Sequence, residues 1–303
     1  MQVITNEQVA SLLTVKDAIT VMRQAFEHYQ RSGAMQQRVR IDAGQNKLSM
    51  MGAIIPGLHA VGAKIYTTIN GKFTFVVVLF SADDGALLAV MEGDSMTEYR
   101  TAAVTALAAD ALARQDAKTL VVFGTGAQAR AHVPALLAVR SFSNILIVGI
   151  DHPDAFAAEI SRKYGVACSV AGAEEAASQA DVLLTATRSP VPLFDGNSVK
   201  PGAFVAAIGS SKPDAREVDD RLVRRAARIV VEWKSQAKVE AGDLLLCDAG
   251  CFDWENVLEL GQLVGPAGVQ RRNEDDIILY KAIGVGLEDV ALAEFIYRKM
   301  AAR

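Results

Sequence analysis

"LVVFGTGAQARAHV", residues 120–133, joins an apolar run to a Gly-x-Gly turn and then to an alanine-rich polar stretch. The apolar run is typical of a buried strand, and the stretch after the turn is typical of a helix. Gly124 permits a sharp turn, Gly126 removes a Cβ that would block a pyrophosphate, and Ala129 lets helix and strand pack closely. The pattern predicts a dinucleotide-binding turn, although it also suits an ordinary tight turn between a strand and a helix.

The chain after residue 118 contains short apolar runs without alternation, separated by helical or loop segments. These runs are TLVVF, NILIVGI, VACSV, DVLLTAT, AFVAAIG and RIVVE. Strands that are apolar on both faces belong to a parallel sheet covered by helices. Ligands of such sheets bind beyond the carboxyl ends of the strands, where this chain carries small or polar residues. These residues are 124–128, 151–152, 185–187 and 209–213. We therefore expect an α/β fold with a Rossmann-type parallel-sheet domain over residues 117–285.

Asp151 follows the second of these runs, where an acidic side chain can accept hydrogen bonds from a ribose. It also suits the N-terminal cap of a helix that begins near Pro153, so both interpretations stay open. A carboxylate at the ribose would repel a 2′-phosphate and favours NAD(H). A charged His152 would partly offset that repulsion, which leaves NADP(H) as the other option.

The first hundred residues have a different pattern. Asn70-Gly71 between two β-rich runs predicts a hairpin, and SADDG predicts a second turn, so this part is an antiparallel meander. Ser95 and Glu98 have the spacing of a capping box and predict the start of a helix. The spacing of four apolar residues predicts a helix over 15–31, on the stripe Val15, Ile19, Met22 and Phe26. We expect a second, α+β domain over residues 1–116, completed by a helix over 286–303.

Composition excludes several classes of protein. A chain of 303 residues with 51% hydrophobic residues can form two domains with substantial cores. A net charge of -4 without a long basic run argues against nucleic acid. The N-terminus lacks a signal-peptide pattern, and no apolar run reaches the roughly 20 residues that cross a bilayer, so we expect no membrane association and a cytoplasmic location.

The three cysteines, Cys168, Cys247 and Cys251, are too few and too scattered for a disulfide framework. Cys247 and Cys251 would need two further ligands to hold a metal, and the sequence offers none nearby. We therefore expect no metal site.

Three cations of the first domain have ordinary explanations in the sequence alone. Arg100 lies on an apolar helical stripe, where it either extends to the edge or is buried against an anion. Lys64 shares a strand face with Tyr66 and Thr68, a pattern that favours a solvent-facing lysine. Arg38 alternates with apolar neighbours, as in a half-exposed strand.

Four stretches together resemble the ornithine cyclodeaminase/mu-crystallin family. They are EYRTAAVTALAADALA (98–113), VVFGTGAQARAH (121–132), AAIGSSKPDAREVDD (206–220) and DIILYKAIGVGLEDVALA (276–293), in family order. The resemblance implies a homodimer. Its outer domain, with the antiparallel sheet, dimerises and contacts a small amino-acid or imino-acid substrate, and its Rossmann domain binds NAD(H) or NADP(H).

The resemblance also implies roles for particular residues. Arg38, Lys64 and Arg100 fall on positions that hold the substrate carboxylate, and Arg100 also approaches the cofactor. We choose Arg38 over Arg40 on its spacing to Met51. Further substrate positions are Ile283 and Gly284. The implied cofactor positions are Gly124, Gly126, Ala127, Gln128, Asp151, Thr187, Ile208, Gly209 and Ser210. Ala282 stands where a serine is usual.

Ser211 is the main departure from the family pattern, because ornithine cyclodeaminases have an aspartate there. A neutral serine is no general base near pH 7 without an activating partner. Reduction of a carboxylated cyclic imine, of the pyrroline-2-carboxylate or piperideine-2-carboxylate type, needs positioning and charge neutralisation more than a base. We therefore expect an imine reductase with Lys64 and Ser211 at the reacting centre. The alternatives are ornithine cyclodeamination, an alanine dehydrogenase-like reaction and a non-catalytic nucleotide-dependent binding protein.

Overall fold

The computed structural model describes residues 1–302, and the chain divides into two compact units. The first unit comprises Met1–Val104 and Gly284–Arg303, and the second comprises Thr105–Ile283. The division falls inside helix α3 (Asp94–Leu112), earlier than the boundary at 116 that the sequence suggested. The guanidinium of Arg140 donates hydrogen bonds to the carbonyls of Ala109 and Ala113, which ties the end of α3 to the second unit.

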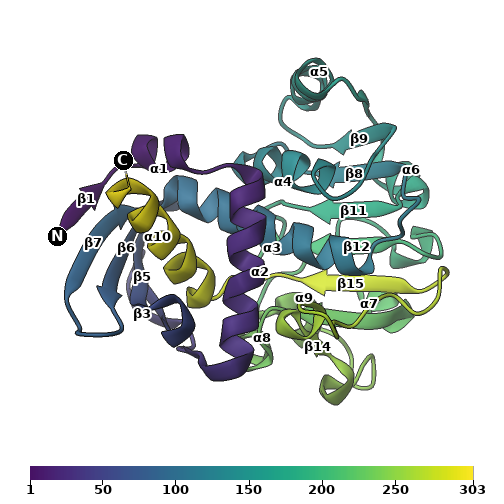
Figure 1. Ribbon diagram of the computed structural model, residues 1–303. Helices are drawn as coiled ribbons and strands as arrows, with labels where there is room; N and C mark the ends of the chain where they lie inside the picture. Colours follow the sequence, from purple (N-terminus) through teal and green to yellow (C-terminus); the bar gives the residue numbers. More distant parts are fainter. Residues whose placement is uncertain (303) are drawn as a thin grey trace. The chain divides into compact units, whose positions relative to one another are not determined.

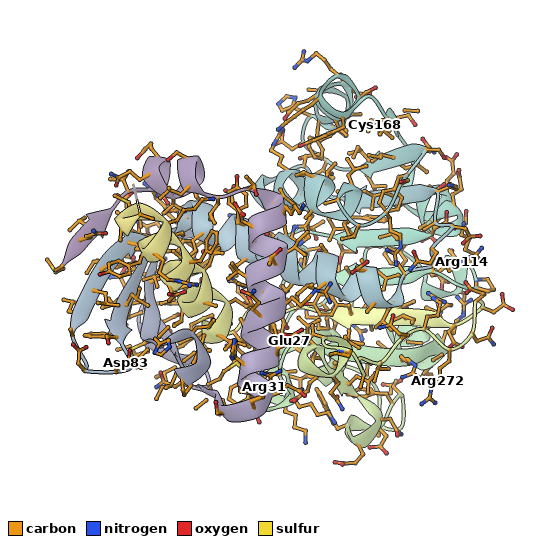
Figure 2. All side chains as sticks on the ribbon, viewed as in Figure 1. Glu27, Arg31, Asp83, Arg114, Cys168 and Arg272 are labelled. Atoms are coloured by element: carbon orange, nitrogen blue, oxygen red, sulfur yellow. The ribbon has the colours of Figure 1, made fainter. Side chains whose placement is uncertain are left out.

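The first unit contains a seven-stranded sheet in the order β1-β7-β6-β5-β4-β2, with β3 paired to β4 (Figure 1). Its pairs are antiparallel except β1 with β7. The strands are β1 (Gln2–Ile4), β2 (Ala34–Met35), β3 (Val39–Ala43), β4 (Asn46–Ile55), β5 (Ala60–Ile69), β6 (Lys72–Ser81) and β7 (Leu87–Glu92). Asn70 and Gly71 have φ angles of 51° and 75°, which confirms the predicted hairpin. Asp83 lies in the second predicted turn, between β6 and β7 (Figure 2).

Helices cover one face of this sheet. They are α1 (Asn6–Leu12), α2 (Val15–Ser32) and α10 (Gly286–Ala301), with a short 3-10 turn, η1 (Pro56–Leu58), between β4 and β5. Helix α10 packs on β4, β5 and α2. The predicted stripe of α2 is shifted, because Val15 and Ile19 are only half-buried. Its buried residues are Ala18, Val21, Met22, Ala25 and Phe26.

The predicted cap of α3 is wrong. Helix α3 begins at Asp94, so Ser95 already lies within its first turn. The Asn6 side-chain oxygen accepts hydrogen bonds from the backbone N–H groups of Asp94 and Ser95, at 3.1 and 3.2 Å. Asn6 therefore caps this helix from 89 positions away in the sequence. It binds N–H groups of the first turn, which have no partner within the helix.

The second unit contains an eight-stranded sheet in the order β10-β9-β8-β11-β12-β15-β13-β14, in which every pair is parallel. The strands are β8 (Thr119–Phe123), β9 (Asn144–Val148), β10 (Ala167–Val170), β11 (Val182–Thr185), β12 (Phe204–Ala207), β13 (Ala226–Val231), β14 (Leu258–Glu259) and β15 (Ile277–Lys281). Each predicted apolar run forms one of these strands. The central strand β15 was not predicted.

Helices and 3-10 turns connect these strands. They are α4 (Ala127–Leu137), α5 (Pro153–Tyr164), α6 (Ala173–Gln179), η2 (Gly196–Ser198), α7 (Asp220–Arg225), α8 (Lys234–Glu240), α9 (Gly242–Leu245), η3 (Trp254–Asn256) and η4 (Leu260–Leu263). The core includes Val121, Leu183, Val205 and Leu279, all completely buried. Burying each such side chain contributes about 1.5–3 kcal/mol.

The strand order of the second sheet reverses at β8. The chain leaves β8 for β9 and β10 on one side, and then returns to place β11 on the other side. Open α/β sheets bind ligands beyond the carboxyl ends of the strands at this type of reversal. Among the helices of residues 1–302, none combines the length and apolar character that a bilayer crossing requires.

Candidate active site

Lys64 of β5 lies on the covered face of the first sheet. Its side chain is nearly inaccessible, with a residue exposure of 1%, so the solvent-facing interpretation is wrong. The Nζ atom lies 3.2 Å from Asp289 Oδ1 and 4.2 Å from the centre of the Phe75 ring. It also donates a hydrogen bond to the Thr97 hydroxyl. Helix α10 covers this face of β5, which alternation in the strand alone does not reveal.

Arg100 of α3 is also buried. Its Nη1 donates to Glu288 Oε2 at 2.5 Å, and its Nε lies 3.5 Å from Asp289 Oδ1. Gly284 makes room for this guanidinium, because a Cβ there would lie 2.5 Å from Arg100 Nη1. Its φ of 73° is also a conformation that favours glycine.

Arg38 lies in the segment between β2 and β3. Its Nη2 donates to the carbonyl of Gly284 at 2.8 Å, and its Nε lies 3.3 Å from Met51 Sδ. Arg38 and Arg100 therefore both meet Gly284. Lys64 was expected at the same site as the two arginines. All three residues lie close together within the first unit, although they are distant in sequence.

Cations and carboxylates lie close together in this group. Lys64 and Arg100 pair with the buried carboxylates Glu288 and Asp289, and the charge of Arg38 also acts on Lys64. Burial lowers the pKa of Lys64 to about 8. Asp289 opposes this shift, whereas the charges of Arg100 and Arg38 reinforce it. A carboxylate bound beside Lys64 would favour its ammonium form. We call these five residues the cation cluster.

The Gly-x-Gly turn of the second unit has space in front of it. Gly124 has a φ of 106°, and a Cβ there would lie 2.5 Å from the carbonyl oxygen of Ala186, at the end of β11. A Cβ built on Gly126 would meet nothing within 4 Å. Gly126 caps α4 without a side-chain hydrogen bond, so Ala127 and Gln128 begin a helix whose first N–H groups can bind an anion. These features fit a dinucleotide pyrophosphate.

Gln128 gives a second sign of a ligand at this turn. Its side-chain Oε1 is buried and has no hydrogen-bond partner within residues 1–302. Its carbonyl accepts a hydrogen bond from His132 Nδ1, at 2.7 Å. A buried acceptor without a partner is costly, and a bound ligand that donates a hydrogen bond would remove that cost.

Asp151 follows β9 and adjoins the turn. The Thr125 hydroxyl donates to the Asp151 carbonyl at 2.9 Å, whereas the Asp151 side chain is 81% exposed. His152, not Asp151, occupies the N-terminal cap position of α5, and no side-chain hydrogen bond caps that helix. The capping interpretation of Asp151 is therefore wrong, and its carboxylate remains accessible to a ribose.

Glu217 joins the ends of β11 and β12, although no pattern in the sequence marks it as a site residue. Its carboxylate accepts hydrogen bonds from the Thr185 hydroxyl at 2.8 Å and from the Thr187 hydroxyl, the Thr187 N–H and the Gly209 N–H at 2.7 Å each. Burial raises the pKa of Glu217, against the effect of Lys281 and of these donors. The Thr187 hydroxyl is thus directed at Glu217, which positions the loop that contains Ile208 and Gly209.

A buried ion pair holds the next part of this loop. Lys281 Nζ lies 2.7 Å from Asp243 Oδ2, both side chains are completely buried, and Lys281 also donates to the carbonyl of Ser210 at 2.6 Å. Ser211, the next residue, is half-buried. Asp243 also accepts the N–H of Glu217 at 2.6 Å. The pair therefore connects to the Glu217 network and fixes the backbone beside Ser211.

Ile283 lies in a different environment from its neighbour Gly284. Its N–H donates to the Glu232 carboxylate at 3.0–3.1 Å within the second unit. The two residues that were expected as one substrate segment thus belong to different compact units.

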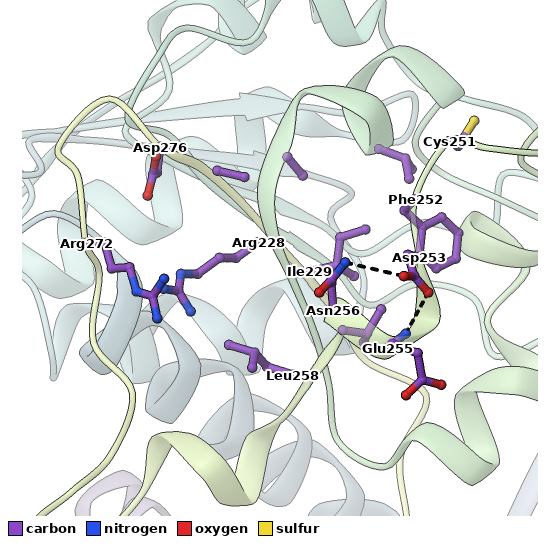
Figure 3. Close-up of a pocket in the computed structure, with 14 residues that line it drawn as sticks. Arg228, Ile229, Cys251, Phe252, Asp253, Glu255, Asn256, Leu258, Arg272 and Asp276 are labelled. Atoms are coloured by element: carbon purple, nitrogen blue, oxygen red, sulfur yellow. Dashed lines mark hydrogen bonds between the residues drawn. The ribbon is translucent and has the colours of Figure 1, made fainter.

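A cavity of about 660 Å³ lies elsewhere in the second unit, beside Arg228 and Arg272 (Figure 3). Cys251 is among its lining residues.

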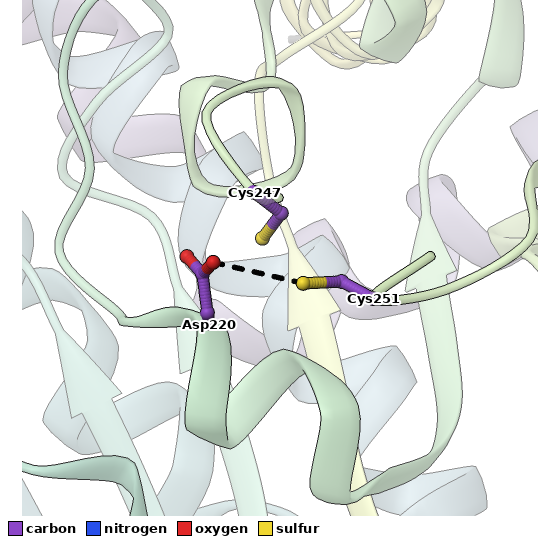
Figure 4. Close-up of side chains that lie close together, drawn as sticks. All are labelled: Asp220, Cys247 and Cys251. Atoms are coloured by element: carbon purple, nitrogen blue, oxygen red, sulfur yellow. Dashed lines mark hydrogen bonds between the residues drawn. The ribbon is translucent and has the colours of Figure 1, made fainter. Parts of the chain in front are cut away.

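Cys247 and Cys251 have a third potential ligand that lies far from them in the sequence. The two sulfur atoms and an Asp220 carboxylate oxygen all lie within 4.8 Å of one another (Figure 4). Cys251 Sγ donates to Asp220 Oδ2 at 3.7 Å. Arg216 Nη1 lies 2.5 Å from the same carboxylate, so a guanidinium already neutralises Asp220.

Comparisons with known proteins give the same assignment along the whole chain. The model of the ornithine cyclodeaminase/mu-crystallin family matches residues 1–303. A Delta(1)-pyrroline-2-carboxylate reductase of Bacillus cereus is 33% identical, over 86% of this chain and 83% of the relative. The structure of a probable ornithine cyclodeaminase of Bordetella pertussis is 44% identical, with a TM-score of 0.97, over 100% of this chain and 97% of that one. The Thermococcus litoralis Delta(1)-pyrroline-2-carboxylate reductase, solved with NADH and L-proline, is 27% identical, with a TM-score of 0.94, over 100% and 98% of the two chains. The chain belongs to the ornithine cyclodeaminase/mu-crystallin family.

Proposed function

We propose that this protein reduces a carboxylated cyclic imine to the corresponding amino acid with a reduced nicotinamide cofactor. The observation that carries the proposal is the convergence of Arg38, Lys64 and Arg100 beside Gly284, which offers three cationic side chains to one substrate carboxylate. The open Gly-x-Gly turn and the buried Gln128 Oε1 support the cofactor. The relative in Bacillus cereus, named for the reduction of pyrroline-2-carboxylate, supports the substrate class.

The reaction requires a hydride at the imine carbon and a proton at the imine nitrogen. A bound reduced nicotinamide supplies the hydride. In this proposal Arg38 and Arg100 neutralise the substrate carboxylate, which makes the adjacent carbon a better hydride acceptor. The Lys64 ammonium donates a hydrogen bond or its proton at the nitrogen. Ser211 lies on the loop that Lys281 and Glu217 hold in place, and offers a hydroxyl without a negative charge.

Ornithine cyclodeamination is the second candidate, because the Bordetella pertussis protein carries that name at 44% identity. That reaction needs activation of water or of an amine, for which Ser211 is poorly suited. The test is to supply the purified protein with NADH and pyrroline-2-carboxylate, and in parallel with ornithine and catalytic NAD⁺. We expect NADH oxidation with the imine and no ammonia from ornithine. Ammonia and proline formed from ornithine would contradict the proposal.

The pH dependence of imine reduction should follow Lys64. Because burial lowers its pKa from 10.5 to about 8, the proton donor is present at neutral pH and lost on the alkaline side. We expect kcat/KM to be constant below about pH 7 and to fall by about tenfold per pH unit well above 8. The substrate's own titration is measured separately and divided out. If kcat/KM of Lys64→Met fell above pH 8 in the same way as that of wild type, the titrating group would not be Lys64.

We propose NAD(H) as the preferred nicotinamide, because the exposed Asp151 carboxylate can accept hydrogen bonds from the ribose hydroxyls and repels a 2′-phosphate. Replacement of Asp151 by Ser should lower the ratio of kcat/KM for NADH to that for NADPH by about 10- to 100-fold, the range for a lost hydrogen bond to a charged group. Asp154→Ser, in the first turn of α5, is the matched control. If the ratio of kcat/KM for NADH to that for NADPH were equal in wild type and Asp151→Ser, Asp151 would not contact the ribose.

We also propose that the protein is a homodimer that associates through the first sheet. Val39 and Ile41 of β3 pair with Met50 and Leu48 of β4, and these four side chains are 38–62% exposed. An exposed apolar sheet face of this kind is typical of an interface.

The substitution Ile41→Lys should convert the dimer to a monomer at micromolar concentration, because it would bury two unpaired ammonium groups about the two-fold axis. Light scattering coupled to gel filtration measures the mass. The control Val191→Lys changes an equally exposed apolar residue of the second unit. A wild-type protein that is monomeric, or an Ile41→Lys variant that remains dimeric, would rule out this interface.

A further inference from the structure

The cavity beside Arg228 lies at the amino ends of strands in the second sheet. Arg228 is near the start of β13, and Asp276 immediately precedes β15 (Figure 3). All strands of this sheet are parallel, so Gly124 and Ser211 follow the opposite ends of their strands. The cavity is therefore separate from the proposed nicotinamide site.

Two arginines converge in this cavity. The guanidinium groups of Arg228 and Arg272 point toward one another (Figure 3). Within residues 1–302, neither makes a hydrogen bond or an ion pair. Burial and the charge of Arg272 lower the pKa of Arg228, and Asp276 only partly opposes them. Two like charges held together are unfavourable unless an anion binds between them.

Neighbouring contacts position the backbone at both arginines. The register of β13 against β15 shifts between Ala226 and Arg228, and such bulges redirect a side chain. Arg271 fixes the loop that carries Arg272, because its guanidinium donates to the carbonyls of Asp276 at 2.7 Å and Gly202 at 3.0 Å. The backbone at both arginines is thus fixed, whereas the side chain of Arg272 is exposed.

The remaining walls restrict what fits. Leu258 lies near Arg228, whereas Phe252, Asp253 and Glu255 lie on the side away from the arginines (Figure 3). Asp276 also lines the cavity. The Asp253 carboxylate accepts the N–H of Glu255 at 2.9 Å, which holds it in place at that side. A ligand with negative charges at both ends would be repelled there.

We infer that this cavity binds a small organic anion with a single anionic group, whose carboxylate or phosphate lies between Arg228 and Arg272 and whose apolar body contacts Phe252 and Leu258. The charge-assisted hydrogen bonds of two guanidiniums suit either oxoanion. Nothing in the proposed reduction requires this cavity, so the inference is independent of the proposed function.

Calorimetric titration of the purified full-length protein tests this inference with defined probes. Benzoate and phenyl phosphate distinguish a carboxylate from a phosphate, and terephthalate carries a second anion at the far end. We expect at least one of the first two to bind, terephthalate to bind at least about tenfold more weakly than benzoate, and Arg228→Met and Arg272→Met each to weaken binding by about tenfold or more. Arg162→Met, an exposed arginine on α5, is the control and should bind like wild type.

Two further measurements accompany the titration. The NADH affinity of each variant should equal that of wild type, because the cavity is at the other end of the sheet. The unfolding midpoint of Arg228→Met should not fall, since Arg228 has no ion-pair partner to lose. Binding of neither benzoate nor phenyl phosphate, or binding that both arginine variants leave unchanged, would overturn the inference. If terephthalate bound as tightly as benzoate, the claim that the ligand carries a single anionic group would be wrong.

Discussion

Replacing Lys64 with methionine should lower kcat/KM for imine reduction by about 10³-fold, within the range of 10²–10⁴ for a lost proton donor. Lys64 Nζ lies 3.2 Å from Asp289, beside Arg38 and Arg100, where it can serve a substrate whose carboxylate those arginines bind. Methionine preserves much of the buried volume, so the loss reflects the ammonium group. Steady-state kinetics with NADH and pyrroline-2-carboxylate measures it.

The control for this variant is Lys47→Met in the neighbouring strand β4. Lys47 is exposed and pairs with Asp42 at 2.8 Å, so its removal should change kcat/KM by less than about twofold. NADH affinity should be unchanged in both variants, which shows that the second unit is intact. If Lys64→Met retained activity within tenfold of wild type, Lys64 would have no part in the chemistry.

Replacing Lys281 with methionine should lower the free energy of unfolding by about 3–5 kcal/mol, because it leaves the completely buried carboxylate of Asp243 without its counter-ion. The same change removes the hydrogen bond to the Ser210 carbonyl and loosens the loop that carries Ser211. Urea unfolding followed by circular dichroism gives the free-energy difference.

Two companion variants separate the lost charge balance from lost packing. The double variant Lys281→Met/Asp243→Asn should regain at least about half of the loss, because asparagine is neutral and still accepts the N–H of Glu217. Lys200→Met breaks a partly exposed pair with Asp181 and should cost less than about 1 kcal/mol. A double variant no more stable than Lys281→Met would show that the buried charge is not the cause.

Short-range signals in the sequence were sufficient for much of the fold. The hairpin at Asn70-Gly71 and the parallel strands of the second sheet depend on local turn chemistry and on continuous apolar runs, and both are present. Strand β15 was missed because Tyr280 and Lys281 shorten its apolar run, although all five of its residues are buried. A lysine inside a sheet is unexpected when charged residues are usually exposed.

The long-range charge pairs could not be derived from the sequence pattern. Arg100 and Glu288 lie 188 positions apart, and no periodicity connects them. The resemblance identified the cations, and the stretch 276–293 contained Glu288 and Asp289 without revealing that they pair with those cations. The Asn6 cap of α3 was missed for the same reason, because only the folded chain brings Asn6 to Asp94.

Transfer of deuterium from the cofactor to the product tests the central claim most directly. The protein would be incubated with pyrroline-2-carboxylate and, in separate reactions, with each C4-deuterated epimer of NADH, and the proline analysed by mass spectrometry and NMR. We predict that one epimer yields proline with a single deuterium at Cα, in a one-to-one ratio to the NADH oxidised. Proline that carries no deuterium from either epimer, or no proline at all, would contradict the assignment of this protein as an imine reductase.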